Sequence, residues 1–116
     1  MHQTPPAKRE PTPDQQILAL IRTFPCLSNR SHAWLTRTTE FDPEHFHSLF
    51  ARASTVEALC ARFILNVWNP HYARAKGWNF DFLTFMTAAD PLSRAALLNW
   101  MRNPSYPHTL GSEHPR

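Results

Sequence analysis

Residues 54–70 read STVEALCARFILNVWNP, and this stretch decides the fold that we expect. Ser54 and Glu57 have the spacing of a capping box, in which each side chain accepts a backbone N–H of the other residue. Apolar residues then recur every three or four positions, which is the period of one helix face. They are Val56, Leu59, Cys60, Phe63, Ile64 and Val67, with Leu65 and Trp68 added in the second half. We therefore predict a central helix over 55–68 that is packed on several sides.

Other helix starts are marked by an Asx residue directly before a proline. The pairs are Asp42-Pro43, Asn69-Pro70 and Asp90-Pro91, and Thr12-Pro13 is similar. The first side chain can accept free N–H groups of the first helical turn, and proline fits the next position because its fixed φ is already helical. Since the chain has only two glycines and hardly any strand-like alternation, we expect an all-α fold.

These signals predict where the helices lie. The expected ranges are 13–23, 43–53, 55–68, 91–102, a short turn of helix after Pro70 that Gly77 stops, and a helix from Asn79 or Asp81 to Ala88. Phe41 and Phe46 have the spacing of a hydrophobic staple around the second start. Over 26–40 two interpretations stay open: Ser31 caps a short helix that presents Trp34, or the stretch is a well-packed loop. The result is a single compact irregular bundle of five to seven short helices around the helix at 55–68.

The two ends of the chain differ in composition from the middle. Residues 1–11 and 104–116 are polar and rich in proline, and they offer little apolar surface to offset the entropy of ordering. We therefore expect a disordered N-terminal tail over 1–11, a helical domain over 12–103 and a flexible C-terminal tail over 104–116.

The charge balance is mildly basic. Twelve Lys and Arg face nine Asp and Glu over the 116 residues, and the isoelectric point is near 9.3. Within 14–102 there are nine basic and seven acidic side chains, far from the dense patch of a dedicated nucleic-acid binder. We interpret the charges mainly as a mixed solvated surface.

The two cysteines, Cys26 and Cys60, lack the CxxC spacing of a redox or metal site. Cys60 lies on the apolar stripe of the central helix and should pack as a small hydrophobe, whereas Cys26 should be the more accessible thiol. The N-terminus has no apolar core of a signal peptide, and no apolar run approaches the length of a membrane span. We expect free thiols in a small cytoplasmic, bacterial protein.

Catalytic, metal and cofactor sites are not indicated by the residue pattern. His45 and His47 are two positions apart on one predicted helix, so they cannot share a metal as an i, i+4 pair does. Most carboxylates already have cap positions, among them Asp42, Glu57 and Asp90, which leaves few free acids or bases. We expect no metal, no cofactor and no enzymatic activity.

The segment from Asn69 to Trp78 is the best candidate for a contact surface. It interleaves aromatic and basic groups as a contact with nucleic-acid phosphates and bases requires; these are His71, Tyr72, Arg74, Lys76 and Trp78. The ordinary alternative is that Tyr72 and Trp78 pack inward while the cations face water.

Residues 82–99 allow a helix-turn-helix interpretation, in which the second helix presents Arg94, Asn99 and Arg102. That helix is mostly Leu, Ala, Trp and Met, however, and a helix so apolar favours burial on two sides. A core helix with one polar strip, including Arg94 and Arg102, explains the pattern better.

The surplus of aromatic residues suggests the leading function. If about 90 residues cannot bury four Trp and eight Phe, some of them form an exposed contact patch, and Trp34 and Trp100 are the candidates. We expect a non-catalytic regulator, adaptor or accessory subunit that acts through protein–protein contacts, with a protein partner or a homodimer. The alternative is a nucleic-acid-binding accessory protein that uses 71–78 and the polar strip of the last helix.

Overall fold

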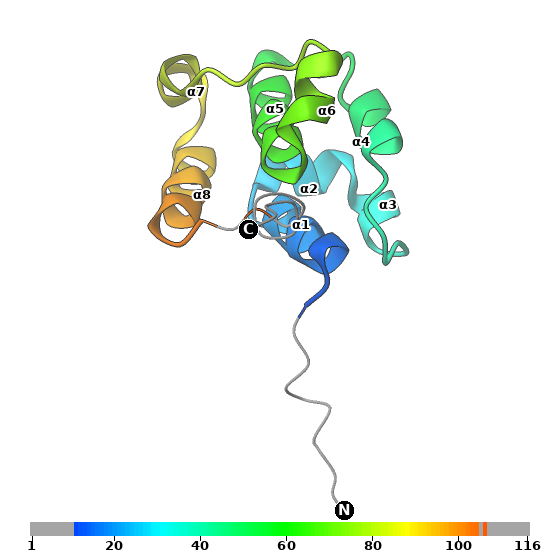
Figure 1. Cartoon of the computed structure of the whole chain (residues 1–116). Coiled ribbons are helices and arrows are strands. Elements are labelled where there is room, and N and C mark those ends of the chain that lie inside the picture. The colour runs from blue at the N-terminus through cyan, green and yellow to red at the C-terminus, as the bar shows by residue number, and fades with distance from the viewer. Residues whose placement is uncertain (1–10, 105, 107–116) are drawn as a thin grey trace, which may run out of the picture.

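A computed structural model of the chain describes residues 11–104 and 106, and it is all-α over these residues (Figure 1). Eight helices follow one another in the described part of the chain. They are α1 (Pro13–Arg22), α2 (Pro25–Arg30), α3 (His32–Leu35), α4 (Pro43–Leu49), α5 (Thr55–Trp68), α6 (Pro70–Ala75), α7 (Phe82–Ala88) and α8 (Pro91–Arg102). The predicted all-α bundle is confirmed, with one helix more than the upper expectation. The predicted tails lie almost entirely outside the described residues.

The predicted helix starts are confirmed at the level of hydrogen bonds. Thr12 and Ser54 each form a complete capping box with the residue three positions later. Asp42, Asn69 and Asp90 each accept backbone N–H groups of the first turn. These caps are local, so the sequence alone could place them.

Helix α5 is the centre of the bundle, as predicted. It contacts α1, α2, α6 and α7, and its residues Cys60, Ala61, Ile64 and Leu65 have no exposed surface. Burial on nearly all sides explains why its second half is apolar around the whole circumference.

Two aromatic clusters fill the space around α5. The first joins α3, α4 and the end of α5: Phe41 lies 5.4 Å from Phe46 and 4.9 Å from Trp68, measured between ring centroids. The second surrounds Phe63, whose ring lies 5.7 Å from Phe24 and 5.4 Å from Phe80. Aromatic pairs at these separations add specific geometry to the apolar burial.

Two local expectations are corrected, and the open alternative over 26–40 is decided in favour of short helices. The helix that starts at Pro43 ends at Leu49 instead of near Ala53, because the chain turns at Phe50 and buries that ring against Phe46. Residues 25–30 and 32–35 are two short helices, and Ser31 between them makes no side-chain cap. Its buried hydroxyl instead donates to the Leu27 carbonyl oxygen at 2.6 Å.

The helices α7 and α8 form one edge of the molecule, on the left in Figure 1, apart from α6, which packs on α5. Among the described residues, no helix combines the length and the apolar character that crossing a membrane would require.

Candidate functional site

The segment 71–78 packs on α5 and also contacts α4 through side chains. The Trp78 ring is 9% exposed and lies 4.4 Å from the His47 ring, measured between centroids. Lys76 pairs with Glu44 at 3.3 Å, and its ammonium lies 5.5 Å from the centre of the Tyr72 ring. The inward packing of Trp78 and Tyr72 therefore matches the ordinary alternative named for this segment.

The Tyr72 hydroxyl is also part of this packing. Partial burial, together with the nearby Glu44 carboxylate, raises the pKa of Tyr72 to about 12. The Tyr72 hydroxyl and the Lys76 ammonium in turn lower the pKa of Glu44. Of the five residues predicted here as contacts, His71, Arg74 and Lys76 are exposed, and Lys76 is already paired with Glu44.

The two predicted contact residues of α8 have different surroundings. Arg94 is half-buried, and its guanidinium donates to the carbonyl oxygens of Ala89 at 2.8 Å and Met86 at 3.5 Å. Arg94 therefore ties the start of α8 to the end of α7. Arg102 is exposed in the last turn of α8, beside Leu98 and Asn99.

The two tryptophans predicted as exposed contacts are both partly buried. Trp34 packs on Phe41, His45 and Phe46, with ring centroids 5.1–6.4 Å apart. Trp100 packs edge-on against Phe63 at 5.1 Å and against Tyr106 at 5.3 Å. Trp34 thus belongs to the first aromatic cluster, whereas Trp100 lines a cavity described below.

An apolar surface that the sequence did not single out lies on α7, on α8 and at Tyr106. Within the described residues, every large hydrophobic side chain that is strongly exposed lies between positions 82 and 106. These six residues are Phe82, Leu83, Leu92, Leu98, Met101 and Tyr106, and we call them the α7–α8 apolar surface. Leu83 is 71% exposed and Leu92 is 63% exposed, so this surface is not a minor extension of the core.

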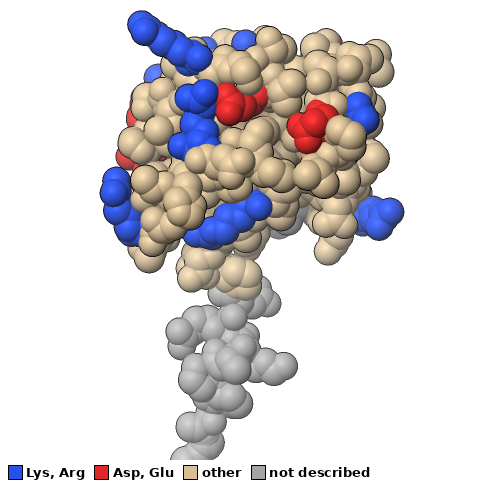
Figure 2. Space-filling model, turned by 180° about the vertical axis from the view of Figure 1, so that it is seen from behind, with Lys and Arg blue, Asp and Glu red and all other residues tan. Residues whose placement is uncertain are grey.

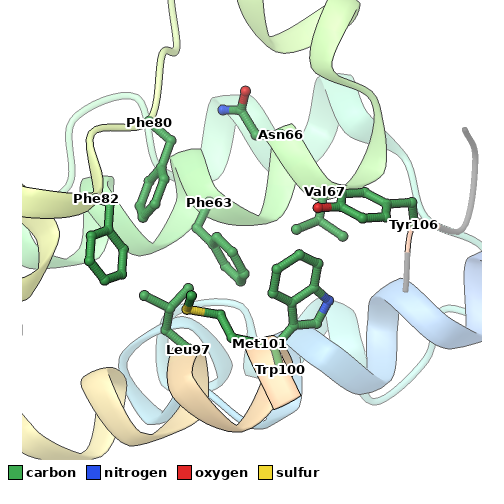
Figure 3. A pocket seen from close by; sticks show the side chains of 9 residues that line it. All are labelled: Phe63, Asn66, Val67, Phe80, Phe82, Leu97, Trp100, Met101 and Tyr106. Atoms are coloured by element: carbon green, nitrogen blue, oxygen red, sulfur yellow. The ribbon is translucent and has the colours of Figure 1, made fainter. Parts of the chain in front are cut away.

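A cavity of about 240 Å³ opens beside the α7–α8 apolar surface (Figure 3). Its wall comes from α5, from the segment before α7, from α7 and α8, and from Tyr106; the lining residues are Phe63, Asn66, Val67, Phe80, Phe82, Leu97, Trp100, Met101 and Tyr106. In Figure 3 Phe80 and Phe82 lie to the left of Phe63, and Trp100 and Tyr106 lie to its right. The lining is almost entirely apolar, which suits an apolar side chain and not a charged substrate.

The two thiols meet beneath α8. Both cysteines are free, and the Cys26 sulfur lies 3.9 Å from the Ser93 hydroxyl. Hydrogen bonds from Cys60 and Ser93 lower the pKa of Cys26. The pKa of Cys60 is raised, because Cys60 contacts Cys26 and is buried. The prediction that Cys60 is buried and Cys26 more accessible is confirmed.

Charged and metal-binding groups are dispersed over the described part of the chain. Figure 2 shows Lys and Arg side chains spread over one face, with Asp and Glu between them. Residues 11–104 and 106 contain no group of three or more His, Cys, Asp or Glu that could hold a metal ion.

Comparison with protein-family models, with curated protein sequences and with solved structures finds no match to this chain.

Proposed function

We propose that this chain is a small, non-catalytic cytoplasmic protein that acts through protein–protein contacts, and that its contact site is the α7–α8 apolar surface. A regulator, an adaptor or an accessory subunit would each work in this way. The observation that supports the proposal is the confinement of the exposed large hydrophobic side chains, among the described residues, to positions 82–106.

The energetic argument rests on apolar area. Burial of apolar surface contributes roughly 25 cal/mol per Å², and side chains such as Leu83 and Leu92 leave most of theirs in water. Large apolar side chains that are exposed along one edge of a molecule are unfavourable for solubility, and apolar surface of this kind usually marks an interaction site where it is contiguous. A partner that covered this edge would remove that cost.

The adjacent cavity adds a specific feature to the surface. Hot spots of interfaces are aromatic or aliphatic side chains that fill well-packed pockets of the partner. A single side chain of a partner, such as Leu, Met or Phe, could enter the space lined by Phe63, Phe82 and Met101.

The proposal is tested by comparing two double variants of the full chain in cross-linking and capture experiments read by quantitative mass spectrometry. Leu83→Ser/Leu98→Ser removes apolar area from the surface, and we expect at least about tenfold less captured partner. Arg74→Ala/Lys76→Ala is the matched control on α6, and we expect capture like that of the wild type. Equal capture by the wild type and the first variant would contradict the proposal.

A further inference from the structure

The two cysteines of the chain belong to different helices and meet in the core. Cys26 lies at the start of α2 and Cys60 lies in the first half of α5. These two helices pack on one another, and the two thiols are hydrogen-bond neighbours. Since the chain has two cysteines in all, each thiol has the other as its one possible disulfide partner within the chain.

The hydroxyl of Ser93 joins the two thiols from the side of α8. It lies 3.9 Å from the Cys26 sulfur, and it is also a hydrogen-bond neighbour of Cys60. Ser93 donates its hydroxyl proton to the Asp90 carboxylate at 2.7 Å, so that its oxygen is left to accept from the Cys26 thiol. Side chains from α2, α5 and α8 therefore form one hydrogen-bonded group that contains both sulfurs.

The two sulfurs differ in their access to solvent. Cys60 has no exposed surface, whereas Cys26 is partly exposed at the edge of the core. A small oxidant such as hydrogen peroxide can therefore reach Cys26 first. A redox-sensitive cysteine typically combines an accessible sulfur, a lowered pKa and a second cysteine next to it. Cys26 has all three, because the hydrogen bonds from Cys60 and Ser93 lower its pKa.

We propose that Cys26 and Cys60 form a reversible oxidation site, at which a peroxide converts the two thiols into a disulfide between α2 and α5. This inference does not depend on the proposed function. It is compatible with a reducing cell interior, because disulfides that form there are usually transient and redox-sensing.

The reaction has two steps. The Cys26 thiolate first attacks one oxygen of hydrogen peroxide, so that an S–O bond forms, the O–O bond breaks, and the released hydroxide takes up a proton to become water. The Cys60 sulfur then attacks the sulfur of the Cys26 sulfenic acid, so that an S–S bond forms, the S–O bond breaks, and a second water leaves with the Cys60 proton. The two thiols lose two electrons and two protons in total, and the peroxide is reduced to two waters.

The position of Cys60 also predicts where the oxidation stops. The Cys26 sulfenic acid forms next to a thiol that the core holds in place, so condensation should outpace attack by a second peroxide molecule. The disulfide closes a loop of about 34 residues, which restricts the unfolded chain. We therefore expect the oxidised protein to unfold at a higher urea concentration than the reduced protein.

The first test uses the reduced full chain, folded and treated with equimolar hydrogen peroxide. Trypsin releases Cys26 within residues 23–30 and Cys60 within residues 53–62. Without reductant, mass spectrometry should find these peptides linked, two hydrogens lighter than their sum, in protein whose intact mass is that of one 13.4 kDa chain. Dithiothreitol should restore both thiols, which it cannot do for a sulfinic acid.

Two matched variants test the roles of the sulfurs. In Cys60→Ala, Cys26 lacks its neighbour, so its sulfenic acid should be trapped by dimedone and should proceed to sulfinic acid with excess peroxide. In Cys26→Ala, the buried Cys60 thiol should be oxidised at least about tenfold more slowly than Cys26 in Cys60→Ala. Far-UV circular dichroism verifies that both variants are folded, and the test on the wild type requires neither of them.

Several outcomes would overturn the oxidation site. These are a disulfide that forms only in protein unfolded by urea, links only between different chains, and sulfinic acid at Cys26 as fast in the wild type as in Cys60→Ala. Leu83→Ser/Leu98→Ser should be oxidised like the wild type, because neither substitution touches the two thiols. Loss of capture in that variant with normal oxidation would support the proposed function and this inference separately.

Discussion

At the scale of single residues, Asp42, Asn69 and Asp90 have one role in common. Each accepts backbone N–H groups that the following helix leaves free in its first turn. Asp90 does more, because one carboxylate oxygen accepts the Ser93 N–H at 3.0 Å and the other accepts the Ser93 hydroxyl at 2.7 Å. It therefore fixes the first turn of α8 and the buried serine beneath it.

Replacing the Asp90 cap should have a measurable cost. We expect Asp90→Ala to lower the free energy of unfolding by about 1 kcal/mol, and Asp90→Asn by much less, because asparagine retains the accepting oxygen. Urea denaturation of dilute protein at neutral pH measures both values. A loss in Asp90→Asn equal to that in Asp90→Ala would mean that the charge, and not the cap, is what stabilises α8.

The pH dependence of the same variants has a defined sign. The hydrogen bond from the Ser93 hydroxyl lowers the pKa of Asp90 in the folded state. The stability that this provides is therefore present above the unfolded pKa, about 3.9, and is lost as the pH falls through the folded pKa. Compared with Asp90→Asn, the wild type should lose stability more steeply below about pH 4. If the stability of the wild type and of Asp90→Asn fell by the same amount as the pH was lowered, this prediction would be contradicted.

The two thiols should differ in reactivity. Since hydrogen bonds from Cys60 and Ser93 lower the pKa of Cys26, and contact with Cys26 and burial raise that of Cys60, Cys26 should be alkylated first. We expect iodoacetamide at about pH 8 to modify Cys26 at least tenfold faster than Cys60. Peptide mass spectrometry over time measures the two rates, and equal rates in native protein would contradict the packing beneath α8.

At the scale of elements, α5 should dominate stability. Phe63 is 4% exposed and its ring contacts Phe24, Phe80 and Trp100. Phe63→Ala should lower the free energy of unfolding by about 3–5 kcal/mol. Leu83→Ala, at a side chain that is 71% exposed on α7, should change it by less than about 0.5 kcal/mol. A small effect at Phe63 would mean that α5 is not the centre of the core.

The end of α6 depends on the backbone conformation of one glycine. Gly77 has φ of +74°, and no atom lies within 4 Å of where a Cβ would stand. Gly77→Ala should therefore destabilise the fold by about 1–2 kcal/mol through backbone strain alone, with no steric clash. Gly77→Asn should cost less, because asparagine tolerates this region better. A higher unfolding temperature for Gly77→Ala than for Gly77→Asn would contradict this explanation.

At the scale of the whole molecule, the arrangement of charge bears on the nucleic-acid alternative. Trp78 and Tyr72 pack against α4, Lys76 pairs with Glu44, and Arg94 is bonded to carbonyl oxygens. Fewer groups of the predicted basic and aromatic surface are therefore available to phosphates than the sequence pattern indicates.

We accordingly expect no saturable binding of labelled single- or double-stranded DNA or RNA in fluorescence anisotropy at about 50 mM salt. Binding that falls tenfold or more by about 200 mM salt would contradict this expectation. If it also weakened in Arg74→Ala/Lys76→Ala, it would place the nucleic-acid contact on α6.

The features that could be predicted from the sequence are those with local causes. The caps at Thr12, Asp42 and Ser54 depend on residues within one turn, and the apolar face of α5 depends on the 3.6-residue period. The glycine stop at Gly77 is equally local. Helix starts, the all-α class and the central position of α5 were therefore accessible without a structure.

Tertiary packing decided the rest, because burial depends on which elements lie opposite one another. Nothing near Phe50 signals a helix end, yet the chain turns there so that the ring can enter the core. Leu97 and Leu98 are adjacent leucines of α8, and only the position of the bundle leaves the first 1% and the second 44% exposed. The sequence by itself determined where helices form; which apolar side chains remain in contact with water was determined by how those helices pack, since exposure is a property of the assembled surface and not of any residue.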